Sequence, residues 1–374
     1  MLPYGRQSIS ESDIAAVVEV LRGDWLTTGP LVTEFETRLG ALSGGHRAVT
    51  ATSGTAALHM AYAAAGVGPG DEVVCTPMTF IASASGASLA GATVVFADVD
   101  PDTALLDPDA VAAVVGPRTK VVTAVDYAGQ PADYVALQRI ADRVGALTLA
   151  DAAHSIGGTS AGRPVGDLAD ITTFSFFPTK NITTGEGGAA VFRDPELAQR
   201  AHEFHFIGLV RDPSRFRITD QGPWHQEVHA FGTNYRLTDL GCALGLSQLT
   251  RLAEFKRRRA EIVARYDAGL TGVEGLALPG RRPGVDPVWH LYPLRVLDGR
   301  RREVYEKLRA EGIGVQVNYL PVYWHPVYAD LGYQRGLCPN AEAFYAEELS
   351  LPLFPDLRDT DVDRVIEALR RALR

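Results

Sequence analysis

Residues 174–188 read FSFFPTKNITTGEGG, and a single lysine, Lys180, lies in the middle of them. An apolar strand is expected over residues 171–177, just before this lysine, and a glycine-rich turn follows it. Its neighbours are aromatic residues, threonines and glycines instead of the charges that usually surround a surface lysine. Burial lowers the pKa of a lysine amine, and the neutral amine can attack a carbonyl. The stretch therefore predicts a reactive lysine, although a strand-end lysine that extends to water has a similar local pattern.

The chemistry that needs such a lysine is a Schiff base with pyridoxal phosphate. This cofactor also needs a carboxylate for its ring nitrogen and a cradle for its phosphate. Asp151 comes directly after a strand predicted over residues 146–150, and Ser53-Gly54-Thr55 follows a strand over residues 47–51 and opens a helix. Small residues at a helix N-terminus present N–H groups to an anion. Taken alone, Asp151 and Ser53-Gly54-Thr55 are equally typical of ordinary helix caps.

Short apolar strands alternate with helical patterns from residue 47 to residue 192. Helices are predicted, for example, over residues 55–65, 81–90 and 134–144. This alternation implies an α/β fold with a mostly parallel sheet that is covered on both faces. The last two strands are joined by the Lys180 loop without a helix, so we expect them to be antiparallel. The seven predicted strands are residues 47–51, 72–76, 93–97, 120–125, 146–150, 171–175 and 188–192.

The three chemical elements are expected to meet at one edge of this sheet. Ligands of such sheets bind beyond the carboxyl ends of the strands. Ser53-Gly54-Thr55, Asp151 and Lys180 each follow a different predicted strand. We therefore expect one site that contains all three.

Other residues near these elements are weaker candidates. Ser175 offers a further hydroxyl to a phosphate group. His154 is suited to lie against a cofactor ring, but it reads equally well as an ordinary polar residue of the following helix. Phe80 also has two interpretations: its ring stacks on a cofactor ring, or it packs in the core. A core position is the default for a lone phenylalanine. His202 and His205 are interpreted as structural, because a metal would need more ligands nearby.

Length and composition predict more than one domain. The chain has 374 residues, of which 46% are hydrophobic, and this exceeds the size of one ordinary domain. Residues 1–30 are expected to form an arm and a short helix that starts near Ser10. Residues 31–250 are expected to form a large cofactor-binding domain, and residues 251–374 a smaller α+β domain.

The expected C-terminal domain begins with a long charged helix over residues 251–266. Its basic run, residues 256–259 (Lys-Arg-Arg-Arg), is interpreted as a solvated helix face rather than a nucleic-acid site. Strands are predicted over residues 289–296 and 314–318. Helices are predicted over residues 302–311 and 360–373.

Charge and cysteine content exclude several classes of protein. The net charge of −9 and the scattered acidic residues argue against a nucleic-acid or anionic-membrane surface. No apolar run is long enough to span a bilayer, and the N-terminus has no signal-peptide core. Cys75, Cys242 and Cys338 lack metal-site spacing and read as buried thiols of a reducing compartment. A cytoplasmic enzyme is expected.

The chain resembles the pyridoxal-phosphate-dependent sugar aminotransferases of the DegT/StrS group, within aminotransferase fold type I. The resemblance implies that Lys180 holds the cofactor as a Schiff base, that Asp151 pairs with the pyridinium nitrogen, and that Thr55 and Ser175 bind the phosphate. It also implies that Asn234 reaches the phosphate of a second subunit, so the enzyme is expected to be a homodimer with shared active sites. The segments that carry the resemblance are residues 52–55, 151–154, 174–180, 185–188 and 232–239.

Within the group, several segments are similar to the transaminase of the pseudaminic acid pathway. That similarity implies amination of C4 of a UDP-linked 4-keto-6-deoxy-N-acetylhexosamine, with L-glutamate as donor. The chain departs from this pattern at Phe177 and Asn318, where histidines are frequent. The similar segments are residues 3–7, 24–30, 182–188, 234–246 and 315–319, and the residues expected to hold the nucleotide are Trp25, Arg211, Tyr319 and His325.

Alternative functions remain open at this stage. Residues 180–183 also resemble the enzyme that makes 4-amino-4-deoxy-arabinose, which acts on a UDP-4-keto-pentose, and a dTDP-ketosugar aminotransferase is a related alternative. A sugar dehydratase of the same fold has histidine in place of the lysine, so Lys180 argues against it. A non-enzymatic regulator with this fold is a further alternative, because fold alone does not fix function.

Overall fold

The structure, a computed structural model, describes residues 1–218 and 220–374. Its large sheet has seven strands: β1 Arg47–Ala51, β2 Glu72–Cys75, β3 Thr93–Phe96, β4 Thr119–Val125, β5 Leu147–Asp151, β8 Ile171–Ser175 and β9 Gly188–Phe192. Their spatial order is β1-β9-β8-β5-β4-β2-β3. Strand β9 is antiparallel to β1 and β8, and the other pairs are parallel. The predicted strands and the antiparallel pair are confirmed, and the carboxyl ends of β1, β5 and β8 share one edge.

Helices cover both faces of this sheet because its central strands are apolar on both sides. Val73 and Cys75 of β2 belong to one buried cluster, and Val74 between them belongs to the other. The first cluster includes α3 Gly54–Ala64, α4 Ala82–Leu89 and α7 Pro195–His205. The second includes α2 Pro30–Leu42, α5 Pro108–Val114, α6 Tyr134–Asp142 and α8 Asp239–Leu249.

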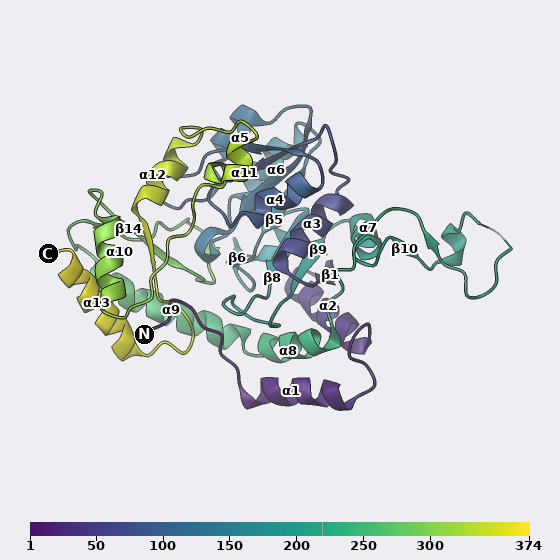
Figure 1. Cartoon of the computed structure of the whole chain (residues 1–374), viewed down its shortest axis with the longest axis horizontal. Coiled ribbons are helices and arrows are strands. Elements are labelled where there is room, and N and C mark those ends of the chain that lie inside the picture. The colour runs from purple at the N-terminus through teal and green to yellow at the C-terminus, as the bar shows by residue number, and fades with distance from the viewer. Residues whose placement is uncertain (219) are drawn as a thin grey trace.

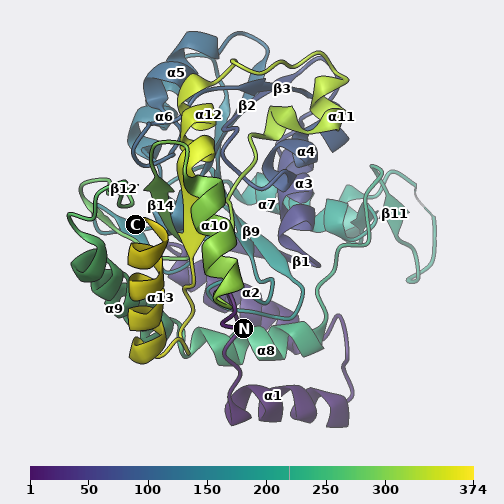
Figure 2. The ribbon, with the colours of Figure 1, turned by 60° about the vertical axis from the view of Figure 1, so that its left-hand side comes forward.

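Helix α1, Glu11–Arg22, lies outside these layers and packs along α8 (Figures 1 and 2). Its N-terminus is a capping box. The Ser10 hydroxyl accepts from the N–H of Asp13, and the Asp13 carboxylate accepts from the N–H of Ser10 at 2.8 Å. The predicted start near Ser10 is thus confirmed by the hydrogen bonds that the Ser-x-x-Asp spacing permits.

The C-terminal part contains a second, three-stranded sheet in the order β12-β14-β15. Its strands are β12 Leu276–Ala277, β14 Tyr292–Val296 and β15 Glu348–Leu351, and its helices are α9 Leu252–Leu270, α10 Arg301–Ala310, α11 Pro326–Ala329, α12 Pro339–Glu347 and α13 Asp359–Ala372. A further small sheet joins β6 Thr159–Ser160, β7 Arg163–Pro164 and β13 Val285–Asp286. The domain limits at residues 30 and 250 stay predictions.

Two predictions for the C-terminal part are wrong. Residues 314–318 form no strand, and Gln316 makes only an isolated bridge to Ser350. The N–H of Asn318 donates instead to the side chain of Glu348 at 2.6 Å, so the ladder stops there. Strand β14 begins at Tyr292 rather than at residue 289, because the N–H of His290 donates to Ala128 outside that sheet.

The basic run on α9 is not uniformly solvated. Lys256 pairs with Asp286 and Arg258 with Asp359, as expected for a charged surface. Arg259 is buried and donates to the carbonyl oxygen of Leu353 at 3.0 Å. It lies four residues after buried Phe255 and therefore on the inner face of the helix. The prediction of a solvated face is wrong for Arg259.

Residues 206–218 and 220–234 form an arm that extends away from the sheet after α7 (Figure 1). Strands β10 Leu209–Val210 and β11 Glu227–Val228 pair within it. The buried carboxylate of Glu227 accepts from the N–H groups of Arg217 and Ile218. Trp224 is 77% exposed and Phe231 fully exposed. The arm therefore buries a charge and exposes aromatic rings.

Candidate active site

A cavity of about 660 Å³ lies at the carboxyl edge of the large sheet. It brings the three predicted elements together, since Ser53 follows β1, Asp151 ends β5 and Lys180 follows β8. The predicted site residues that line it are Ser53, Gly54, Thr55, Phe80, Asp151, His154, Ser175, Lys180 and Tyr319. The positions of the predicted strand ends thus identified many of the residues that line this cavity.

The loop between β1 and α3 forms an anion cradle. The Ser53 hydroxyl caps α3 by accepting from the N–H of Ala56 at 3.1 Å. Within the described chain, the N–H groups of Gly54 and Thr55 and the hydroxyl of Ser175 donate to no protein acceptor. A Cβ atom at Gly54 would lie 2.7 Å from the Cβ of Ser175, so only glycine lets the cradle approach β8 this closely. Free donors at a helix N-terminus suit a phosphate group.

Lys180 lies at the floor of the cavity on a loop held by its own hydrogen bonds. The N–H of Lys180 donates to Phe177, and the hydroxyl of Thr183 donates to the carbonyl oxygen of Phe176 at 3.0 Å. The surrounding protein removes water from the amine and lowers the pKa of Lys180 to about 8, while the Asp151 carboxylate opposes this shift. A substantial fraction of the amine is therefore neutral near pH 8.

Asp151 is buried at the end of β5 with both carboxylate oxygens hydrogen-bonded. Ser83 donates to Oδ2 at 2.6 Å and the N–H of Ala153 donates to Oδ1 at 3.1 Å. Burial raises the pKa of Asp151, and the two hydrogen bonds and the Lys180 amine lower it in part. The carboxylate is thus held in one orientation in a site with little water.

His154 is buried against two other side chains of the cavity. Its ring centroid lies 4.3 Å from that of His290, and its Nε2 atom lies 3.4 Å from the Tyr319 hydroxyl. Burial, together with the Lys180 and Arg259 cations, holds the pKa of His154 well below its usual range. Within the described residues its Nδ1 atom is buried without a hydrogen-bond partner. The ring is therefore neutral and faces a cavity that can hold a flat ligand.

Phe80 is 59% exposed at the cavity rim, and its ring centroid lies 6.4 Å from that of Tyr319. The default core position is therefore wrong for this residue. The chain leaves β2, passes the buried Thr79 and turns outward before α4, so the ring points to the cavity opening. This position suits stacking on a bound ring.

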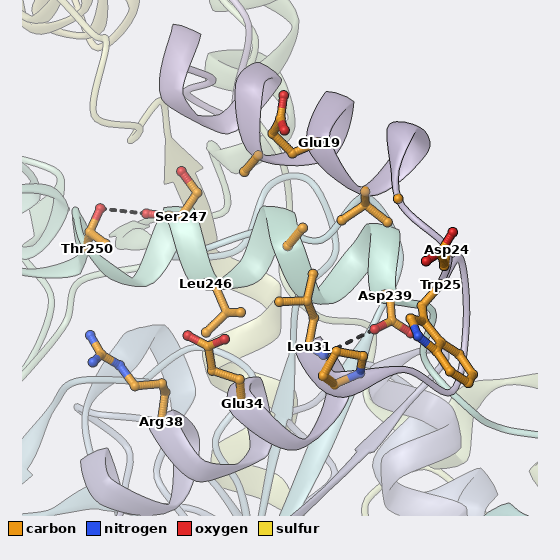
Figure 3. A pocket seen from close by; sticks show the side chains of 15 residues that line it. Glu19, Asp24, Trp25, Leu31, Glu34, Arg38, Asp239, Leu246, Ser247 and Thr250 are labelled. Atoms are coloured by element: carbon orange, nitrogen blue, oxygen red, sulfur yellow. Dashed lines mark hydrogen bonds between the residues drawn. The ribbon is translucent and has the colours of Figure 1, made fainter.

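Four predicted residues do not line this cavity. Asn234 is exposed at the end of the arm, where it forms an isolated bridge with Phe206. His325 precedes α11. Trp25 lies at one end of a different cavity, of about 570 Å³, between α1, α2 and α8 (Figure 3). Asp239 closes that end by accepting from the N–H groups of Gly29 and Leu31 at 2.8 and 3.1 Å.

Arg211 lines a third cavity at the base of the arm, together with Arg236 and Phe206. The guanidinium groups of Arg211 and Arg236 lie 4.6 and 4.3 Å from the centroid of the Phe206 ring. Trp25 also reaches this cavity. Within one chain, therefore, Trp25 and Arg211 lie close to each other but outside the Lys180 site.

Sequence reasoning missed several residues that complete the site. Tyr4, His290 and Gln316 line the cavity from segments far away in the chain, and no local pattern marks them. Ser83 carries a weak signal, because it is a hydroxyl residue on the inner side of a helix made of small residues. Its contact with Asp151 depends on how α4 packs and is visible only in the structure.

The described residues give no support for a metal or a membrane span. No group of three or more histidine, cysteine or acidic residues among them is arranged to hold a metal ion. Among the same residues, no helix is long and apolar enough to cross a membrane.

The cavity residues fit pyridoxal phosphate. The free N–H groups of the Gly54 cradle match a phosphate, the buried Asp151 matches a ring nitrogen, and the neutral ring of His154 faces the space where a flat ring would lie. Lys180 supplies an amine whose pKa lies near neutrality. These are the groups that this cofactor needs from a protein.

Comparisons with known proteins agree with this chemistry. The DegT/DnrJ/EryC1/StrS aminotransferase family matches residues 7–370. The spore coat polysaccharide biosynthesis protein SpsC of Bacillus subtilis is 40% identical over 375 residues, which cover 99% of this chain and 96% of that protein.

Solved structures extend the similarity to the fold. The PMP-form of the putative sugar aminotransferase Spr1654 from Streptococcus pneumoniae has a TM-score of 0.94 at 32% identity and covers 100% of this chain and 99% of its own. Helicobacter pylori PseC, an aminotransferase involved in the biosynthesis of pseudoaminic acid, has a TM-score of 0.92 at 28% identity, covering 99% and 98%. The expected fold type I is confirmed. The chain belongs to the DegT/DnrJ/EryC1/StrS family and is a pyridoxal-phosphate-dependent sugar aminotransferase.

Proposed function

We propose that this enzyme transfers an amino group from L-glutamate to C4 of a UDP-linked 4-keto-6-deoxy-N-acetylhexosamine. The observation that carries the proposal is the cavity of about 660 Å³ that brings together Lys180, Asp151 and the Ser53-Gly54-Thr55 cradle. The similarity of residues 182–188, 234–246 and 315–319 to the pseudaminic acid transaminases supports this sugar class. The structural similarity to PseC supports the same class.

The residues expected to hold the cofactor each have a proposed role. Bound pyridoxal phosphate supplies an electron sink for cleavage of a C–H bond next to nitrogen. Lys180 would hold the cofactor, and its amine, when free, would accept and return the proton at the substrate carbon. Asp151 holds the ring nitrogen protonated, and the Ser53-Gly54-Thr55 cradle with Ser175 holds the phosphate.

The pKa of Lys180 suits this proton transfer. A group with a pKa near the working pH can both accept and donate a proton. Burial lowers the pKa of the amine to about 8, so a larger fraction of it is neutral and able to accept the substrate proton near neutral pH than for a solvated lysine. Because the amine stays tethered to the chain, it remains within reach of the reacting atoms.

The cavity rim is the proposed sugar subsite. Phe80, Phe177, Asn318 and Tyr319 line it, and Phe177 and Asn318 are the positions where the chain departs from the pseudaminic acid pattern. This departure favours a second candidate, another UDP- or dTDP-ketosugar such as a UDP-4-keto-pentose. Tyr319 is a nucleotide-binding candidate inside the cavity, whereas Trp25, Arg211 and His325 are proposed only for a substrate bound between two copies of the chain.

We propose a homodimer with shared sites. Asn234 is exposed and outside the cavity of its own chain, and the arm beside it exposes Trp224 and Phe231. An exposed polar residue next to exposed aromatic rings is typical of an interface. We propose that the arm packs on a second copy and brings Asn234 to the phosphate there.

The sugar is tested by incubating the holoenzyme with glutamate and a panel of UDP- and dTDP-ketosugars. Mass spectrometry then follows 2-oxoglutarate and the amino sugar. We expect the UDP-linked 4-keto-6-deoxy-N-acetylhexosamine to be aminated at C4 with the highest kcat/KM. Preference for a dTDP-sugar, or amination at C3, would refute the assigned substrate but not the enzyme class.

The shared site is tested by mixing two inactive variants, Lys180→Ala and Asn234→Ala. Hybrid dimers contain one site with both a wild-type Lys180 and a wild-type Asn234, so we expect activity to return after subunit exchange. Mass-labelled subunits show independently that exchange took place. If exchange occurs and activity stays absent, the sites are not shared.

A further inference from the structure

We propose that Ser83, supported by Thr79, is a positioning residue for Asp151 and holds its carboxylate ionised and aimed at the ring nitrogen of the cofactor. The inference rests on the role proposed above for Asp151. It assigns a function to two hydroxyl groups on the loop and helix that follow β2. Neither hydroxyl needs to touch the substrate for this role.

The contact between Ser83 and Asp151 is short and buried. Ser83 lies in the first turn of α4 and is fully buried, and its Oγ atom donates to Oδ2 of Asp151 at 2.6 Å. The N–H of Ala153 donates to the other oxygen at 3.1 Å. A hydrogen bond to a buried charge is among the stronger ones in proteins. Removing Ser83 would leave Asp151 with the Ala153 bond alone on its protein side.

The number of protons on the Ser83 hydroxyl and the Asp151 carboxylate decides which group donates in each hydrogen bond. An ionised carboxylate only accepts, and a serine hydroxyl has one proton. Ser83 therefore donates to Asp151 at 2.6 Å rather than to the more distant carbonyl oxygen of Phe80 at 3.4 Å. It then accepts from Thr79, whose Oγ1 lies 2.7 Å from the Ser83 Oγ. The three groups form an ordered chain from Thr79 to Ser83 to Asp151. Thr79 is buried and lines the same cavity.

The main chain of Ser83 is also fixed by a hydrogen bond from another helix. The hydroxyl of Tyr62 on α3 donates to the carbonyl oxygen of Ser83 at 2.7 Å and lies 2.9 Å from the Thr123 hydroxyl of β4. Gly86, one turn further along α4, allows this approach, because a Cβ atom there would lie 3.1 Å from Cε2 of Tyr62. The position of Ser83 is therefore fixed from two elements other than its own.

The electrostatic surroundings explain why this support is needed. Among the described groups that interact with Asp151, Lys180 favours the ionised carboxylate, and Asp126 is acidic and disfavours it. The remaining titratable neighbours are neutral when protonated: Tyr62, Cys75, Tyr134 and Tyr319. Burial raises the pKa of Asp151 and the Ser83 bond lowers it. Without Ser83, the carboxyl would gain a proton at a higher pH and lose its preferred orientation.

The test compares the holoenzymes of Ser83→Ala, Ser83→Thr and Thr79→Val with Ser85→Ala. Ser85 lies on the same helix, is half-buried and does not contact Asp151, so it controls for a general effect on α4. Three quantities are measured: kcat, the pH midpoint of the acid limb of kcat/KM, and the pH titration of the cofactor absorbance.

We expect Ser83→Ala to lower kcat by about 10- to 100-fold, as for loss of a hydrogen bond to a charged group. The acid limb and the absorbance titration should both move to higher pH. Ser83→Thr should restore most of the activity and the wild-type pH midpoints, because it keeps the hydroxyl. Thr79→Val should cause a smaller loss in the same direction, and Ser85→Ala none.

Unchanged pH midpoints in Ser83→Ala, or equal losses in Ser83→Ala and Ser85→Ala, would overturn the inference. If Ser83→Ala fails to fold, the pH midpoints of Ser83→Thr and Thr79→Val decide it in the same way. Asp151→Asn separates this inference from the proposed function. If that variant keeps full turnover, the role of Asp151 is wrong; if it loses turnover while Ser83→Ala stays normal, only the role of Ser83 is wrong.

Discussion

The cavity around Lys180 and the arm at residues 206–218 and 220–234 both bury ionisable groups, but only the arm also exposes large aromatic rings. In the cavity Asp151 is buried and Lys180 is half-buried, so both ionisable groups lose contact with water. The arm buries the carboxylate of Glu227 and exposes Trp224 and Phe231. Both arrangements are costly for an isolated chain, because buried charges lose hydration and exposed rings order water.

The difference lies in how each region is stabilised within one chain. The cavity groups are fixed by hydrogen bonds from several elements, such as those of Ser83 and Ala153 to Asp151. The exposed rings of the arm have no comparable support, since Phe231 is fully exposed. The cavity is therefore preformed for a small cofactor, whereas the exposed rings of the arm would be covered only in the homodimer that we propose. The two regions make separable predictions.

The largest effect is expected at Lys180. Lys180→Ala should lower kcat by about 10²- to 10⁴-fold or more, because it removes the group that transfers the proton. Borohydride reduction of the wild-type holoenzyme followed by peptide mapping should find a phosphopyridoxyl group on Lys180. A label on another lysine would show that the cavity has been assigned to the wrong residue.

Asp151→Asn should have the next largest effect. The neutral amide no longer holds the ring nitrogen protonated, so we expect at least about a 100-fold loss of kcat, with the cofactor still bound. Absorbance spectroscopy measures cofactor content and steady-state kinetics measures turnover. Full loss of the cofactor would instead indicate that Asp151 contributes mainly to binding.

The arm is tested by replacing its exposed rings. Trp224→Ser with Phe231→Ser should raise the dimer dissociation constant by about 30-fold or more, as expected for aromatic interface residues. Sedimentation velocity over a range of protein concentrations measures this constant. Val135→Ser replaces an exposed apolar residue of α6 and serves as the control. Equal dissociation of both variants would argue against the arm as the interface.

The smallest effect is expected at Glu348, and it concerns stability rather than activity. Glu348 is a buried carboxyl with hydrogen-bond partners in its own chain. It accepts from the N–H of Asn318 and from the Ser350 hydroxyl. Burial raises the pKa of Glu348 from 4.5 to about 8. Between these values the unfolded state has already released a proton that the folded state keeps, so the free energy of unfolding should fall as pH rises.

Glu348→Gln should remove this dependence. In the wild type we expect a fall of up to about 1.4 kcal/mol per pH unit across the window from about 5 to 8, levelling off above it. Chemical denaturation at a series of pH values measures the slope for both proteins. A slope in the variant equal to that of the wild type would assign the pH dependence to other groups.

Much of the fold was predictable because parallel strands and amphipathic helices leave short, regular patterns. The limits of β8 and β9 and the capping box at Ser10 were correctly placed for this reason. The pattern failed at residues 314–318, where the alternation Val-Gln-Val is typical of a strand but the chain turns away and the N–H of Asn318 donates to Glu348. It also failed at Phe80, whose aromatic side chain is as typical of a core as of a cavity rim.

By itself, the sequence determined the approximate limits of the large sheet's strands along the chain and the identity of three chemical groups, Ser53-Gly54-Thr55, Asp151 and Lys180. These depend on neighbours a few residues away and on side-chain chemistry. Only the tertiary structure decided which distant groups support them. Ser83 and Asp151 are 68 residues apart, and Tyr4 and Asn318, which share a hydrogen bond, are 314 residues apart. Such contacts arise because packing of whole helices and sheets brings the groups together, and no local periodicity encodes that packing.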